Sequence, residues 1–254
     1  TVGADGRGSP VREMAGIAMR SRDYRQTSIV ATAAHARPHR GVAHERFLPG
    51  GPFAILPLPD ADDGAAPWPH RSSIVWTEGA AIAERMLRLE RRAFDQELAE
   101  RFGDQFGAVL SVGPIGAFPL KLVLSERMTA PRVALVGDAA RAIHPIAGQG
   151  FNLGLRDSAE LAEQAGVRLA LGLDPGAPDV LAAYAARRLM DVGGMIAATD
   201  GMNRLFSNDI WPLRHSRRLG LAAVQALPPL KRRFMRHAMG LVGRSATLAG
   251  KDPV

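Results

Sequence analysis

The segment from Arg132 to Asp157 contains the densest group of residues that could do chemistry. A short apolar run ends there in Gly137-Asp138, and Gly148-Gln149-Gly150 opens a long helical pattern. A helix N-terminus presents unpaired N–H donors and a positive dipole, which suit a phosphate or the electron-rich edge of a ring. A carboxylate at the carboxyl end of a strand, as expected for Asp138, can accept hydrogen bonds from ligand hydroxyl groups. The pattern predicts a ligand-binding strand–turn–helix; the simpler alternative is a glycine-capped turn without a ligand.

The first twelve residues read as the end of a strand, a glycine-rich turn at Asp5-Gly6 and the start of a short helix. Because Thr1 stands in the middle of such a motif, we expect the N-terminal part of a longer protein to precede it. No G-x-G-x-x-G follows a strand in the sequence, and that motif marks the ADP-binding βαβ unit of roughly 30 residues. The sequence therefore predicts a nucleotide site that lacks its ADP-binding part.

Hydrophobic spacing predicts the elements that would position these residues. Short apolar or β-branched runs predict strands at 28–34, 53–58 and 73–77, with a loop at 60–71. One amphipathic helix is predicted over 80–102. Its apolar residues at helical spacing are Ile82, Met86, Leu89, Ala93 and Leu98.

The second half of the chain reads as more helical. Residues 109–124 predict one or two strands with a Gly-Pro break, and 132–136 predict a short apolar strand. Helices are predicted over 154–171 and 178–199, and two more within 214–243. A strand-rich middle and a helical end predict an α/β fold of mixed α+β character.

Composition and charge exclude several classes of protein. The chain has 254 residues, of which 46% are hydrophobic and 22% charged, and it has no Cys. These fractions exclude wholesale disorder, and the lack of Cys excludes disulfides, zinc–thiolate sites and iron–sulfur clusters. The longest stretch free of charged side chains, 105–120, has 16 residues broken by Gly and Pro. That is short of the roughly 20 apolar residues that a membrane span needs.

The basic charge is concentrated near the C-terminus. Residues 204–244 carry nine basic side chains and one acidic side chain, a net +8, so the rest of the +7 chain carries −1. An apolar stripe that includes Leu230 and Phe234 runs beside Lys231, Arg232 and Arg233 at near-helical spacing. This pattern is typical of a helix that lies on an anionic membrane surface. A helix packed on the body of the protein with a solvated basic face is the alternative.

The seven histidines do not show the spacing of a metal site. His35 and His39 are four residues apart, but they flank Pro38 in a predicted loop. We therefore expect no metal ion. His144 is expected to orient the turn before the long helix rather than to act as a general base.

One family resemblance covers essentially the whole chain. The run His144-Pro145-Ile146-Ala147-Gly148-Gln149-Gly150-Phe151-Asn152-Leu153-Gly154, closed by Asp157, resembles the hallmark segment of the ubiquinone-biosynthesis flavin hydroxylases. Asp5-Gly6 with Ser9 and Arg12 resembles the Asp-Gly motif of the same family. The segments 198–207 and 228–232 look like its helical C-terminal region. These are class A aromatic hydroxylases with the p-hydroxybenzoate hydroxylase fold.

The resemblance implies how the chain divides and folds. It implies a p-hydroxybenzoate hydroxylase-like FAD-binding fold that lacks its N-terminal βαβ unit. Residues 1–22 would end the FAD-binding domain, and 23–125 would form a sheet-based substrate domain. Residues 126–172 would return to the FAD-binding domain, and 173–254 would form a helical C-terminal region.

The resemblance also implies a cofactor site. Asp138, beside Gly137, would bind the ribityl chain of FAD, and Gly148, Gln149 and Gly150 would form the turn beside the flavin. The backbone N–H groups of Phe151 and Asn152 would stabilise negative charge on the reduced ring. Pro145 would line the reactive face of the flavin, and Asp5, Gly6 and Arg12 would serve both FAD and NAD(P)H. No side chain is identified as the catalytic base.

Two departures from the family pattern matter. Arg141 stands where the family often carries His, which leaves a pyrophosphate contact at this position open. Without a G-x-G-x-x-G loop, the 254 residues alone are expected to bind FAD weakly.

The resemblance implies a monooxygenase that uses NAD(P)H and O2, through a flavin C4a-hydroperoxide, to hydroxylate a polyprenylated phenol on the route to ubiquinone. Its partners would include an anionic membrane surface and other ubiquinone-biosynthesis proteins, and it would work in the cytoplasm at the inner face of the plasma membrane. The alternative is an inactive fragment or scaffold of a ubiquinone-biosynthesis assembly. Nucleic-acid binding is not expected, because the basic segment carries no recognisable motif and few interleaved aromatic residues.

Overall fold

The computed structural model describes residues 1–144, 148–206, 224, 226–229 and 231–232. Pro145 and most of the region 214–243, where two helices are predicted, lie outside these residues. The chain divides into two compact units. In the described part, the first unit contains residues 1–22, 121–144, 148–202 and the few described residues between 224 and 232, and the second contains 23–120 and 203–206. Each unit has its own hydrophobic core.

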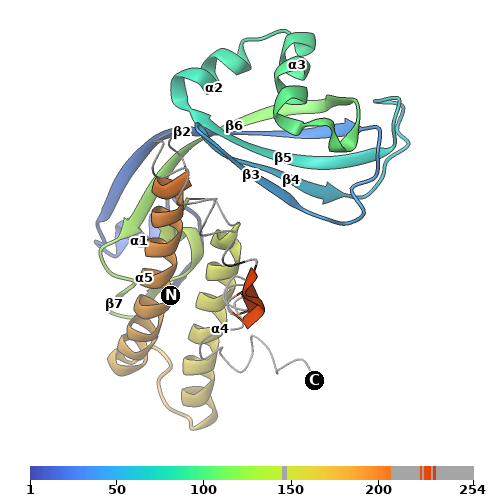
Figure 1. Cartoon of the computed structure of the whole chain (residues 1–254). Coiled ribbons are helices and arrows are strands. Elements are labelled where there is room, and N and C mark those ends of the chain that lie inside the picture. The colour runs from blue at the N-terminus through green and yellow to red at the C-terminus, as the bar shows by residue number, and fades with distance from the viewer. Residues whose placement is uncertain (145–147, 207–223, 225, 230, 233–254) are drawn as a thin grey trace. The chain divides into compact units, whose positions relative to one another are not determined.

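The second unit is a curved antiparallel sheet (Figure 1). Its strands are β2 (Met19–His35), β3 (His44–Leu48), β4 (Gly51–Leu58), β5 (His70–Gly79) and β6 (Val109–Ser125). The strand order of the whole sheet is β3-β4-β5-β2-β6-β9. The strand β9 (Arg141–Ala142) pairs with Val123 and Leu124 at the end of β6, which belong to the first unit as β9 does. The predicted strands are all present, and 109–124 form one strand. β2 begins nine residues before the predicted start, because backbone pairing accepts polar residues such as Arg20 and Gln26.

Alternate residues of this sheet form the core of the second unit. Phe53 of β4 pairs in register with Trp76 of β5, which pairs with Ile29 of β2, and each of the three side chains is at most 1% exposed. Helices α2 (Ala80–Leu87) and α3 (Arg91–Phe102) cover that face (Figure 1). A short 3-10 helix, η1 (Asp104–Phe106), follows α3.

The single helix predicted over 80–102 is wrong, because the structure has two helices. Glu90 adopts an extended conformation (ψ 152°) and turns the chain between α2 and α3. The two helices lie at an angle to each other in Figure 1. A straight helix of 23 residues would be about 35 Å long, and two shorter helices follow the twisted sheet better. Ile82, which the spacing predicts on the apolar face of the helix, is 40% exposed, whereas Phe94 is buried.

His35 is a fully buried histidine at the end of β2. Its Nδ1 lies 2.8 Å from the carbonyl oxygen of Arg37, so Nδ1 carries the proton and donates. Its Nε2 lies 2.9 Å from Ser72 Oγ, and the rings of His39 and His70 lie about 6 Å away. Burial, and secondarily the charges of His39 and His70, hold the pKa of His35 below its usual value of 6.5, although the Arg37 hydrogen bond opposes this shift. The fold therefore favours the neutral ring.

We expect the second unit to lose stability in mild acid through His35. Well above pH 6.5 the His35 ring is neutral in both the folded and the unfolded chain, so the contribution of this ring to the free energy of unfolding no longer changes with pH. As the pH falls below 6.5, the unfolded chain binds a proton before the folded chain does, so the free energy of unfolding falls. Urea unfolding between pH 5 and pH 8 measures this slope. His35→Gln should flatten this slope; an equally steep slope in that variant would show that His35 does not cause it.

The first unit contains a small sheet of order β1-β8-β7. β1 (Val2–Gly3) pairs in parallel with β8 (Val133–Leu135), and β7 (Thr129–Ala130) pairs with β8 in antiparallel fashion. The predicted strand at 132–136 is therefore confirmed, as are the strand end, turn and short helix at the start of the chain. That short helix is α1 (Pro10–Met14).

Two long helices, α4 (Gln149–Ala170) and α5 (Pro178–Phe206), follow in the first unit. Both predicted helices are confirmed, and each is longer than predicted. The inward positions of α4 include Leu153, Asp157 and Glu160, spaced by four and three residues. On α5, Leu181 and Tyr184 pack against Ala134 of β8 and Val136 just after it. Among the helices that the structure describes, none is both long and apolar enough to cross a bilayer.

Candidate functional site

The turn after β8 carries the carboxylate that the sequence singles out. Gly137–Ala139 form a short 3-10 turn, η2, directly after the strand. Gly137 has φ +59°, a left-handed conformation that glycine adopts without strain. The side chain of Asp138 is 46% exposed, and its Oδ2 pairs with Arg7 Nε at 3.4 Å. The Asp138 carboxylate is thus available to a ligand.

The Asp5-Gly6 loop lies beside this turn. Asp5 Oδ2 accepts a hydrogen bond from the N–H of Val11 at 3.2 Å, and Ser9 Oγ accepts one from the N–H of Arg12 at 3.0 Å. A hydrogen bond from Ser9 lowers the pKa of Asp5 below its usual value. Both side chains therefore help to start α1.

Arg12 is buried and binds backbone oxygens. Its guanidinium donates to the carbonyl oxygens of Arg7 at 2.9 Å and Ala139 at 3.2 Å. In this way Arg12 joins the Asp5-Gly6 loop to the turn that carries Asp138. A contact between Arg12 and FAD or NAD(P)H stays a prediction, because the structure directs its described hydrogen bonds inward.

The first turn of α4 contains no acidic residue. Gly148 precedes it with φ 60° and ψ 18°, and within the part of the chain that the structure describes no side-chain cap is present. A Cβ added at Gly148 or Gly150 would meet no atom of the described residues within 4 Å. Phe151 is 75% exposed, and Asn152 is also exposed. The N–H groups of this turn can therefore serve a ligand.

The turn and α4 approach each other closely. A Cβ added at Gly154 would lie 3.3 Å from the Cα of Gly137, so a side chain there would push the turn away from the helix. Gly137, Arg141, Ile143, Gly150 and Leu153 line a narrow pocket at this contact. The structure thus brings together Gly137, Asp138 and the glycine-rich start of α4, as the sequence predicts.

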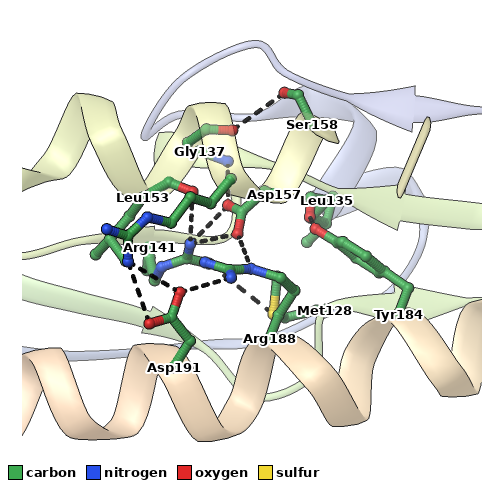
Figure 2. Close-up of polar contacts among 12 residues, drawn as sticks. Met128, Leu135, Gly137, Arg141, Leu153, Asp157, Ser158, Tyr184, Arg188 and Asp191 are labelled. Atoms are coloured by element: carbon green, nitrogen blue, oxygen red, sulfur yellow. Dashed lines mark hydrogen bonds and ion pairs between the residues drawn. The ribbon is translucent and has the colours of Figure 1, made fainter. Parts of the chain in front are cut away.

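Behind the turn lies a buried group of charged side chains (Figure 2). The carboxylate of Asp157 is fully buried, and both of its oxygens lie 2.6 Å from Nη2 of Arg141. Oδ1 also accepts a hydrogen bond from Arg188 Nε at 2.6 Å, and Oδ2 accepts one from the N–H of Gly137 at 2.9 Å. Asp157 is therefore the centre of the group.

The outer side of this group reaches solvent through Asp191. Arg188 donates from Nη1 to Asp191 Oδ2 at 2.6 Å, and Arg156 donates to the same carboxylate at 3.3 Å. Burial disfavours the charged form of Arg188, but Asp157 and Asp191 raise its pKa above the usual value. Burial also opposes ionisation of Asp191, yet Arg188 and Arg156 lower its pKa.

The sequence did not predict the α5 part of this group. Arg188 and Asp191 are three residues apart, which places them on one helix face, but nothing local connects them to Asp157. Tyr184, one turn earlier, donates its hydroxyl to the carbonyl oxygen of Leu135 at 2.8 Å. Burial raises the pKa of this phenol well above its usual value. Arg141, whose pyrophosphate contact was left open, turns inward to Asp157.

Comparison with known proteins identifies the family. A profile of the family described as FAD binding domain matches residues 1–199. The chain belongs to this FAD-binding family. It is 54% identical over 239 residues to the ubiquinone hydroxylase UbiL of Rhodospirillum rubrum, covering 94% of this chain and 54% of that protein. It is 35% identical over 240 residues to the 3-demethoxyubiquinol 3-hydroxylase of Escherichia coli, covering 94% of this chain and 59% of that enzyme.

Solved structures confirm the predicted p-hydroxybenzoate hydroxylase-like fold. The anhydrotetracycline hydroxylase OxyS of Streptomyces rimosus has a TM-score of 0.66 at 26% identity, over 99% of this chain and 48% of its own. The p-nitrophenol 4-monooxygenase PnpA of Pseudomonas putida has a TM-score of 0.72 at 17% identity, over 96% of this chain and 59% of its own. The chain spans little more than half the length of the relatives it matches.

The residues of the FAD-binding domain fit FAD. An exposed carboxylate, Asp138, can accept from ribityl hydroxyls, and the first turn of α4 offers N–H donors without a competing acid. Because Gly148 and Gly150 have no Cβ, a flat ring can approach the backbone at these two positions. The roles of Asp5, Gly6, Gln149, Phe151 and Asn152 toward the cofactor stay predictions. Within the described residues, no cluster of three or more His, Asp or Glu side chains is arranged to hold a metal ion.

Proposed function

We propose that this FAD-binding chain is part of an aromatic-ring hydroxylase that acts on a polyprenylated phenol of ubiquinone biosynthesis, with NAD(P)H and O2 as co-substrates. The observation that carries the proposal is the 54% identity with a ubiquinone hydroxylase over 94% of the chain. The open turn of α4 beside Asp138 supports it, because those residues suit a flavin. Residues 23–125 would form the substrate domain.

Bound FAD would supply the redox chemistry that inserts one oxygen atom of O2 into the ring and releases the other as water, with NAD(P)H as the electron donor. The chain would hold this cofactor. Asp138 would accept hydrogen bonds from the ribityl hydroxyls, and the N–H groups of Phe151 and Asn152 would face negative charge on the reduced ring. Fixed dipoles of this kind stabilise charge without reorganising during the reaction.

A spectrum and a product assay on the full-length protein test this proposal. We expect visible flavin absorption in the purified protein. We also expect NAD(P)H oxidation that depends on a short-chain prenylated phenol, with a product heavier by one oxygen atom. A protein without flavin bands would contradict the proposal and leave the scaffold alternative.

A membrane surface is part of the same proposal. A polyprenylated phenol dissolves in the bilayer, and the basic residues of 204–244 give this chain a net +8 there. A basic segment of this charge is attracted to an anionic leaflet. This attraction supports a location at the cytoplasmic face of the plasma membrane, which is part of the proposal. Other ubiquinone-biosynthesis proteins would be its partners at that surface.

Replacing Arg232, Arg233 and Arg236 with Gln is expected to weaken sedimentation with anionic liposomes. Each basic residue near such a bilayer contributes about 1 kcal/mol, and salt screens the attraction, so the difference should shrink at high salt. Turnover of a soluble short-chain phenol should hardly change. The matched control replaces Arg20, Arg88 and Arg92, which are exposed outside this segment. Equal liposome binding by the wild type and the Arg232 triple variant would reject the membrane role.

A further inference from the structure

Arg188 of α5 reaches the flavin-binding turn through one intermediary, Asp157 (Figure 2). Gly137 and Asp138 are consecutive residues, so the direction of the Asp138 side chain depends on how the Gly137 peptide is held. Among the described contacts, the N–H of Gly137 donates to Asp157 Oδ2 at 2.9 Å. The Gly137 φ of +59° fixes the same peptide in the left-handed region.

The orientation of Asp157 depends in turn on two arginines. Its four short contacts use both oxygens: Oδ1 faces Arg141 and Arg188, and Oδ2 faces Arg141 and Gly137. A carboxylate has about four acceptor positions, so this set occupies all of them. Arg141 contacts both oxygens from a single nitrogen, whereas Arg188 contacts Oδ1 alone. Loss of Arg188 would therefore let the carboxylate of Asp157 rotate about its Cβ–Cγ bond.

Arg188 is itself fixed from the other side. Its guanidinium bridges Asp157 and Asp191 through two different nitrogens, each at 2.6 Å. Asp191 is one-third exposed, whereas the side chain of Arg188 is 7% exposed. A planar fork held at two points is a rigid support, which a lysine ammonium cannot reproduce.

We propose that Arg188 is a positioning residue for FAD: acting through Asp157, it holds the Gly137–Asp138 turn in the orientation in which Asp138 meets the cofactor. The inference rests on the proposed flavin site. It connects Arg188, which lies outside the motifs that carry the family resemblance, to the affinity of the enzyme for its cofactor.

A double-mutant cycle on the full-length protein tests this role, with the FAD dissociation constant as the readout. Arg188→Met is expected to raise this constant about tenfold, the effect of losing one hydrogen bond to a charged group. If Arg188 acts through Asp138, the same substitution in an Asp138→Ala background should change the constant less than twofold. Equal effects in both backgrounds would overturn the proposal, because general loosening of the fold does not depend on Asp138.

Arg187→Met is the matched control, on the same helix and with the same change. Arg187 pairs with Glu160 at 2.7 Å, but its side chain is 47% exposed, so the FAD dissociation constant should stay unchanged. Arg188→Lys replaces Arg188→Met in the cycle if the latter does not fold, and it should raise the constant by a few-fold.

Hydrogen exchange without FAD gives a second readout. The Gly137 amide should exchange faster in Arg188→Met than in the wild type or Arg187→Met, because its acceptor has moved. A wild type that binds no FAD contradicts the proposed function. The positioning role alone is contradicted if the wild type binds FAD and Arg188→Met either binds it equally well or leaves amide exchange at Gly137 unchanged.

Discussion

Asp157→Ala is expected to destabilise the first unit by about 3–5 kcal/mol, the usual cost of removing one partner from a buried ion pair. The substitution leaves the guanidinium groups of Arg141 and Arg188, each less than a tenth exposed, without their shared carboxylate. It also removes the acceptor of the Gly137 N–H. Thermal or urea unfolding of the full-length protein measures the loss.

Asp174→Ala provides a close control for this experiment. Asp174 also binds one arginine through both oxygens, Arg132 at 2.7 and 3.2 Å, and it accepts an N–H from Gly176 at 2.9 Å. The difference is exposure, because the side chains of this pair are 46% and 69% exposed. Water screens and replaces such contacts, so stability should hardly change. Similar losses in the two variants would show that burial does not set the energy of the Asp157 group.

Asp138→Ala is expected to weaken FAD binding by about ten- to a hundredfold with little change in stability. A hydrogen bond to a charged group contributes roughly 1.5–3 kcal/mol, which corresponds to that range of affinity. The fold should persist, because the carboxylate is half-exposed and its described contact is the 3.4 Å pair with Arg7. Fluorescence titration of the full-length apoprotein with FAD gives the dissociation constant.

Two further variants separate the Asp138 carboxylate from its surroundings. Asp138→Asn keeps an acceptor oxygen but loses the charge, so its affinity should fall between those of the wild type and Asp138→Ala. Arg7→Ala removes the partner of Asp138 and should change the affinity much less. An unchanged dissociation constant in Asp138→Ala would remove this residue from the flavin site.

Local spacing was sufficient for the elements that carry the site. The apolar run before Gly137 predicts β8, and the glycines at 148 and 150 predict the start of α4. The motif that ends at Asp157 also indicated the flavin family, which the family profile confirms. These features need no long-range information, because each depends on a few consecutive residues and their backbone preferences.

Local spacing in the sequence could not predict the contacts between distant segments of the first unit. Arg12 was predicted to touch the cofactor, yet its described hydrogen bonds are to the carbonyl oxygens of Arg7 and Ala139. Arg188 stands 31 residues after Asp157, and its approach depends on how α5 packs against α4 and β8. Charge and residue type alone do not show whether an arginine faces a ligand, solvent or a buried carboxylate.

The amino-acid sequence by itself determined the family, the cofactor class and the turn that presents Asp138, because a long ungapped motif specifies backbone geometry residue by residue. Only the tertiary structure decided which charges are buried behind that turn, that residues 80–102 form two helices, and that His35 is enclosed. The physical reason is that burial and ion pairing depend on neighbours supplied by distant segments. The energy of a charge is set by how much water those neighbours exclude.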